Sequence, residues 1–181
     1  TLTTGLVAYY PFNGNANDES GKGNNGSVSG AEFVEDRLGR TNGAIEFKNK
    51  ATVNIGYFNA PTSTISLWVK ANGRDGENIV SPEKWRHIVR LENLELFGTE
   101  KSIPKSKWVH IVRVHYVSGN EINSEHNSIL YYLNGELISN EERRSEFLVG
   151  GVLLGKDNNY ESYYTGLMDD LLIYNRALRK E

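Results

Sequence analysis

The chain contains no cysteine among its 181 residues. Disulfide bonds, thiolate metal sites and a thiol nucleophile are therefore excluded. Because no covalent cross-link is available, we expect the hydrophobic core to stabilise the fold, with a hard cation bound by oxygen atoms as the one auxiliary.

Long apolar runs and an excess of basic residues are also absent. The chain has no stretch of 18 apolar residues and no charged-then-apolar leader, so we expect neither membrane insertion nor a signal peptide within it. Its 20 Lys and Arg against 23 Asp and Glu give a formal net charge of −3, which disfavours nucleic acid and anionic membranes as partners. The start at Thr1 and the charged end at 179–181 predict that the chain is part of a larger multidomain polypeptide whose leader has been removed.

The residues that are abundant favour many short β-strands joined by turns: the chain has 10 Tyr, 6 Phe, 3 Trp and 18 Gly. Alternating or short apolar runs predict strands at residues 6–12, 44–47, 52–55, 65–69, 88–91, 108–117, 128–133, 136–138, 147–154 and 167–174. Between two of these runs, Asn134-Gly135 predicts a two-residue hairpin. Since no helical periodicity, internal repeat or linker interrupts the pattern, we expect an all-β fold in a single domain spanning residues 1–181.

Strict alternation predicts which side chains face the core. In residues 65–69 the aliphatic positions Ile65, Leu67 and Val69 share one face, which we expect to point inward. Trp68 shares the other face with Ser66 and Lys70, and we expect another segment to cover it.

The two ends of the chain carry motifs of a known family. Residues 5–27 read GLVAYYPFNGNANDESGKGNNGS, and residues 166–178 read GLMDDLLIYNRAL. Shorter motifs lie between them at residues 43–47 (GAIEF), 65–69 (ISLWV), 108–112 (WVHIV) and 132–136 (YLNGE). Together they resemble the laminin-G-like domains of the concanavalin A-like lectin and glucanase superfamily. This resemblance implies a jelly-roll β-sandwich of two antiparallel sheets, with the first and last strands side by side, in an extracellular or cell-surface protein.

The loop at residues 13–26 is rich in side-chain oxygens and glycines, a composition that suits calcium. The resemblance implies one structural calcium, with Asp18 and Asp169 as side-chain ligands and Asn25 and Asn13 contributing amide or carbonyl oxygens. Asp169 shares strand parity with the apolar residues that follow it, so we expect it to point toward the core, and Asp170 to point outward. The alternative is that Asp18 and the asparagines bond to their own backbone in turns, and that Asp169 accepts backbone amides.

Exposed tyrosines beside polar side chains favour carbohydrate binding, because aromatic rings stack on sugar faces. Tyr160 and Tyr163 lie with Asn158 in a late polar loop, and Trp85 adds an aromatic residue elsewhere. These four are the candidate ligand-binding residues. The alternative is that the tyrosines only anchor the loop.

An enzymatic role lacks its sequence pattern. Glycan-cleaving members of such folds need two carboxylates on one face of a strand, as in Glu-x-Asp-x-Glu, and no such spacing occurs. The acidic pairs 141–142 and 169–170 are consecutive, and the four histidines are neither clustered nor set beside a catalytic partner. We therefore expect a non-catalytic recognition module that binds carbohydrate or an extracellular protein. A scaffold or adhesin domain that binds no sugar, and a glycan-cleaving domain, are the alternatives.

Overall fold

The computed structural model describes residues 2–73, 77–83, 88–96, 99–117, 127–142, 148–157 and 160–178. No helix in these residues has the length and apolar character needed to cross a membrane. The strands are β1 (Leu6–Tyr10), β2 (Ser27–Ser29), β3 (Glu32–Val34), β4 (Ala44–Phe47), β5 (Thr52–Ala60), β6 (Ser63–Ala71), β7 (Glu77–Pro82), β8 (Val89–Glu92), β9 (Glu95–Leu96), β10 (Val109–Val117), β11 (Asn127–Leu133), β12 (Glu136–Glu142), β13 (Leu148–Leu154) and β14 (Gly166–Tyr174).

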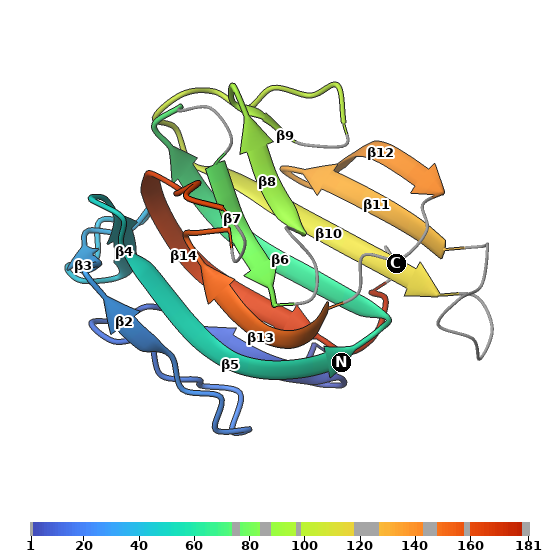
Figure 1. Cartoon of the computed structure of the whole chain (residues 1–181), viewed down its shortest axis with the longest axis horizontal. Coiled ribbons are helices and arrows are strands. Elements are labelled where there is room, and N and C mark those ends of the chain that lie inside the picture. The colour runs from blue at the N-terminus through green and yellow to red at the C-terminus, as the bar shows by residue number, and fades with distance from the viewer. Residues whose placement is uncertain are drawn as a thin grey trace.

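The strands form two antiparallel sheets that pack face to face (Figure 1). The larger sheet has the order β12-β11-β10-β6-β14-β4-β3, and β1 also pairs with β14. The smaller sheet has the order β2-β5-β13-β7-β8-β9 and lies in front of the larger one in this view. The predicted all-β jelly-roll sandwich is confirmed.

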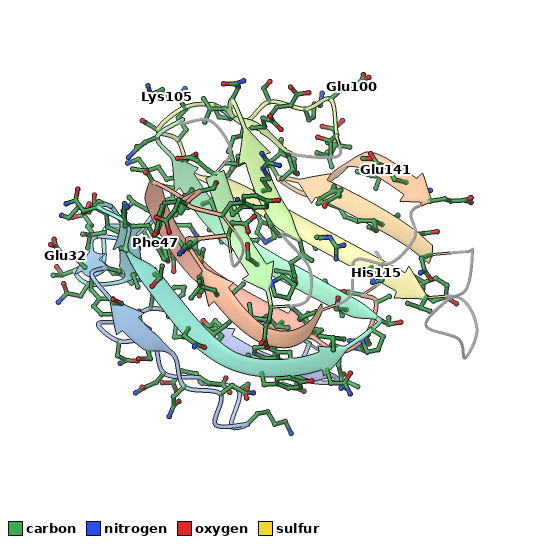
Figure 2. The ribbon with its side chains drawn as sticks, in the orientation of Figure 1. Glu32, Phe47, Glu100, Lys105, His115 and Glu141 are labelled. Atoms are coloured by element: carbon green, nitrogen blue, oxygen red, sulfur yellow. The ribbon has the colours of Figure 1, made fainter. Side chains whose placement is uncertain are left out.

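Alternating side chains of both sheets fill the core between them. Ile65, Leu67 and Val69 on β6 are fully buried, as the alternation predicts. Phe47 on β4 and His115 near the end of β10 are also buried (Figure 2). One continuous hydrophobic cluster joins the two sheets.

The hairpin predicted at Asn134-Gly135 is confirmed. It joins β11 to β12, and its two central residues have φ angles of 50° and 84°. Positive φ at both positions is the type I′ geometry, which matches the twist of the flanking strands.

The first and last strands lie side by side, as the resemblance implies. Tyr9 of β1 pairs with Leu172 of β14. One edge of β14 is occupied throughout by β6, so β4 and β1 share its other edge. Strand β4 covers residues 166–168 and β1 covers residues 171–174, which leaves Asp169 and Asp170 at the junction between them.

Among the register shifts of the described strands, the bulges in β14 and β5 decide which way the side chains of the site face. In β14 three steps from Asp169 to Leu172 match only two steps of β6, and Asp170 has a φ of 45°. In β5 three steps from Asn54 to Tyr57 match two steps of β13, and Gly56 has a φ of 90°. Each extra residue reverses the faces of the side chains that follow it.

Candidate functional site

The loop at residues 13–26 covers the free edge of β1. The carboxylate of Asp18 accepts the Tyr9 amide at 2.9 Å, and the Glu19 amide donates to the Tyr9 carbonyl at 2.8 Å. The side-chain amide of Asn24 donates to the Val7 carbonyl at 2.8 Å. An exposed strand edge would present unpaired backbone groups to other chains, and this loop satisfies them.

Asp18 organises this loop through backbone amides. Besides Tyr9, it accepts the amides of Ser20 at 2.9 Å and Asn24 at 3.0 Å. Burial alone would raise the pKa of Asp18, but the hydrogen bonds from Ser20, Tyr9 and Asn24 outweigh it and lower that pKa below its ordinary value. Asn25 Oδ1 in turn accepts the amide of Asp18 at 2.9 Å. These are the turn contacts of the alternative interpretation.

The prediction that Asp169 points toward the core is wrong. Asp169 lies directly opposite Trp68, which shares the outer face of the larger sheet with Ser66. Because of the bulge at Asp170, Asp169 and Leu171 lie on opposite faces of the sheet, and of the two only Leu171 points inward. Asp169 is nevertheless fully buried.

Arg37 pairs with both carboxylates at the strand junction. Its guanidinium bonds Asp169, and it bonds Asp170 at 2.7 Å. Tyr9 donates its hydroxyl hydrogen to Asp170 at 2.7 Å. Burial and the Asp170 carboxylate raise the pKa of Asp169, and Arg37 lowers it; the raising effects are larger, so the pKa of Asp169 is about 6. Arg37 also lies 4.8 Å from the ring centre of Trp68, so another segment covers this tryptophan as predicted.

The contacts of the four proposed calcium ligands do not fit one ion. Tyr9, whose amide donates to Asp18, pairs with Leu172, and Asp169 lies three residues away on β14. Because the bulge makes these three residues match two steps of β6, Asp169 and Leu172 are roughly 7 Å apart along the strand. Three amides fill most of the acceptor capacity of Asp18, and a guanidinium occupies Asp169. The fourth residue, Asn13, is exposed and accepts a bond from Asn15 through its backbone carbonyl. In the described ranges no three His, Asp or Glu side chains gather as a metal site.

Two of the four candidate ligand-binding residues, Tyr160 and Tyr163, lie in the described part of the late loop. Tyr160 is half-exposed. The Tyr163 ring centre lies 5.4 Å from the Lys50 ammonium and 5.2 Å from that of Lys156, and its hydroxyl donates to Glu161 at 3.0 Å. This hydrogen bond and those from the two lysines lower the pKa of Glu161 to about 2. Tyr163 is thus engaged by groups of its own loop and by Lys50 from the turn between β4 and β5.

The other two candidates, Trp85 and Asn158, lie outside the described residues. A sugar-binding role for all four residues stays a prediction.

A groove of about 240 Å³ lies where β1, β5 and the 13–26 loop meet. Strand β5 runs along the lower side of the molecule in Figure 1. We call this groove the β1/β5 groove. Its lining combines apolar, aromatic, amide and ammonium groups: Val7, Lys22, Asn24, Tyr57, Phe58, Asn59, Ala60 and Asn175. None of the lining residues that the structure describes carries a carboxylate.

Sequence reasoning missed Tyr57, the aromatic residue of this groove. The predicted strand stopped at Ile55, whereas β5 continues to Ala60. A signal is present in the sequence: Val53 and Ile55 are apolar at odd positions, Phe58 and Ala60 are apolar at even positions, and Gly56 lies between them. Such a change of parity at a glycine indicates a bulge.

Comparison with known proteins gives a family and a set of similar folds. A family model described as the concanavalin A-like lectin/glucanases superfamily matches residues 39–181, and no curated protein matches the chain. Domain 4 of AbnA, an extracellular arabinanase from Geobacillus stearothermophilus, in complex with arabinotriose, is similar with a TM-score of 0.75 at 18% identity. This similarity covers 96% of this chain and 94% of that one.

Two toxin domains share the fold over part of their length. The binding domain of Paraclostridial Mosquitocidal Protein 1 has a TM-score of 0.70 at 17% identity, covering 99% of this chain and 51% of that one. The receptor-binding domain of botulinum neurotoxin type G has a TM-score of 0.69 at 15% identity, with 96% and 48% covered. The chain thus spans about half of each toxin domain. With the family model matching most of its length, the chain belongs to the concanavalin A-like lectin/glucanase superfamily.

Proposed function

We propose that residues 1–181 form one non-catalytic, carbohydrate-binding module of an extracellular or cell-surface protein. The observation that carries this proposal is the lining of the β1/β5 groove, whose described residues include a tyrosine, three asparagines and a lysine but no acidic residue. Aromatic faces and amides suit a ligand with both apolar C–H faces and many hydroxyl groups. Such a groove can bind a sugar without cleaving it.

The placement of the acidic residues supports a role without catalysis. Glycoside hydrolysis needs two carboxylates about 5 to 10 Å apart on either side of the scissile bond. The adjacent pair Asp169 and Asp170 is bonded to Arg37, which leaves neither acid free to transfer a proton. Glu32 and Glu46 lie opposite each other on β3 and β4, and Lys48 pairs with both of them. Glu141 lies at the opposite margin of the molecule from Glu32 (Figure 2).

The neighbouring folds support the ligand class and the location. The arabinanase domain, which matches almost end to end, was solved with arabinotriose and belongs to an extracellular enzyme. The botulinum neurotoxin domain is a receptor-binding domain, so a protein partner is the alternative ligand class.

A glycan array probed with the whole chain tests the proposal. For roughly a dozen non-hydrogen atoms at about 0.3 kcal/mol each, one sugar ring gives a Kd on the order of 1 mM. Dense array display and solution NMR titration are therefore the suitable measurements. We expect saturable binding to at least one oligosaccharide class and no hydrolysis of the same panel. Hydrolysis that one carboxylate substitution abolishes would establish an enzyme instead.

A further inference from the structure

We propose that the β1/β5 groove holds one sugar ring of the glycan, with Tyr57 stacking on the ring and Asn59, Asn175 and Lys22 bonding its hydroxyl groups. This inference rests on the proposed carbohydrate-binding function and assigns it a place. Pockets that enclose drug-sized ligands measure about 300–1,000 Å³, so a groove of about 240 Å³ suits one ring and leaves the rest of a chain in solvent.

The bulge in β5 turns Tyr57 out toward solvent. Val53 and Ile55 are buried before the bulge, and Phe58 and Ala60 are buried after it. Without the extra residue, Tyr57 would follow Ile55 into the core. With it, the side chain is 63% exposed, although a tyrosine favours at least partial burial.

The residues beside Tyr57 leave its ring uncovered. The preceding residue is Gly56, and the residue directly opposite on β13 is Gly151, so neither position adds a side chain. Asn54 Oδ1 accepts the Gly56 amide at 3.0 Å, which holds the bulge in place. An uncovered aromatic ring on a fixed backbone is the arrangement that stacking on a sugar face requires.

Three polar groups around the groove are available to a ligand. Asn59, Asn175 and Lys22 are exposed, and in the described part of the chain their side chains make no hydrogen bond or ion pair. An amide both donates and accepts, and an ammonium donates three hydrogens, which matches the mixed donor and acceptor character of sugar hydroxyls.

Hydrogen bonds within the chain join the walls of the groove to one another. Asn24 is bonded to β1 through Val7, as described above. The hydroxyl of Tyr10 lies 2.6 Å from the Asn24 carbonyl oxygen and 3.2 Å from that of Ile55, which connects the loop to β5. A site with fixed walls loses little conformational entropy on binding.

The test is an NMR titration of the whole chain with trisaccharides of arabinose, xylose, glucose, mannose and galactose. We expect amide shifts at Tyr57 and Asn59 with the trisaccharide that binds. Tyr57→Ala should weaken that binding at least tenfold, and Asn59→Ala should weaken it several-fold. Tyr57→Phe, which keeps the ring, should stay within threefold of the original chain. Thermal melting checks that each variant is folded.

Tyr116→Ala is the matched control: it removes a tyrosine of β10 that is 42% exposed, and it should not change the affinity. Tyr160→Ala removes the half-exposed tyrosine of the late loop, the competing candidate site, and separates that site from the groove. Unchanged binding in folded Tyr57→Ala and Asn59→Ala, or loss of binding in Tyr160→Ala alone, overturns the groove assignment and leaves the proposed function standing. Absence of binding to any trisaccharide and to the whole array overturns both.

Discussion

Replacing Arg37 by methionine should destabilise the fold by about 2–4 kcal/mol at pH 7. The partner Asp169 is fully buried, and its pKa of about 6 against 3.8 already represents a cost of about 3 kcal/mol for ionising it in the folded state. Removing one partner of a buried pair typically costs about 3–5 kcal/mol. Since the Arg37 side chain is 18% exposed, we expect the lower part of that range or slightly less.

The loss should also depend on pH, and its sign follows from proton binding. In the original chain the folded pKa of Asp169 lies above the unfolded value, so the folded state binds more protons between about pH 4 and 6, and stability falls as the pH rises through that window. Without Arg37 the folded pKa of Asp169 rises further, and the fall continues above pH 6. The difference between variant and original chain should therefore be larger at pH 8 than at pH 5.

Urea denaturation at pH 5, 7 and 8, followed by tryptophan fluorescence, measures both effects. The matched control is Arg40→Met in the same loop: Arg40 pairs with Asp36, which keeps its hydrogen bonds from the amides of Leu38 and residue 40. This control should lose less stability than Arg37→Met, and its loss should not change between pH 5 and 8. Equal losses in the two variants, or a pH-independent loss in Arg37→Met, would refute the role assigned to the Asp169 pair.

Three further predictions concern the loops. Asp18→Ala should cost about 2–4 kcal/mol at pH 7, because three backbone amides lose an ionised acceptor. Because the folded pKa of Asp18 is lowered, this contribution is complete above its unfolded value near pH 4 and is lost as the pH falls further, so a difference that stays constant on acidification below pH 4 would contradict it. Millimolar calcium added to chelator-treated protein should leave the melting temperature unchanged, and a clear rise would reveal an ion site that these contacts do not provide. Gly155→Ala should cost about 2–4 kcal/mol, since Gly155 has a φ of 82° and an added Cβ would collide with the Phe47 ring. The control Gly39→Ala should cost only about 1 kcal/mol, because Gly39 has a φ of 80° but open space around it. Equal melting temperatures of the two variants would contradict this prediction.

Most of the strands could be predicted because one of their faces is buried and the other is not. Strand β6 shows this pattern clearly, and the prediction of its inward residues is confirmed. Strand β7 was missed for the opposite reason: all six of its residues are buried, and they include Glu77, Asn78 and Pro82, so no alternation marks it. Strands β2, β3 and β9 have two or three residues each, too few to show a period.

The partner of the acidic pair could not be predicted. Arg37 is 132 residues away from Asp169 in the sequence, and no local pattern links them. The resemblance offered calcium as the cation for Asp169, whereas the fold brings a guanidinium from the chain itself to that place. Only the adjacency of β4, β1 and β14 defines the junction at which the two side chains meet.

The sequence by itself determined the β character of the chain and the hairpin at Asn134, because these depend on alternation and turn chemistry, which are local properties of the chain. The sandwich and the pairing of its ends were implied by the resemblance of its motifs to the family. Only the tertiary structure decided which way Tyr57 and Asp169 face. Each lies beside a single extra residue, at Gly56 or Asp170, and one extra residue reverses every face beyond it. Whether a strand absorbs such a residue depends on the register of the neighbouring strand, which is a long-range contact.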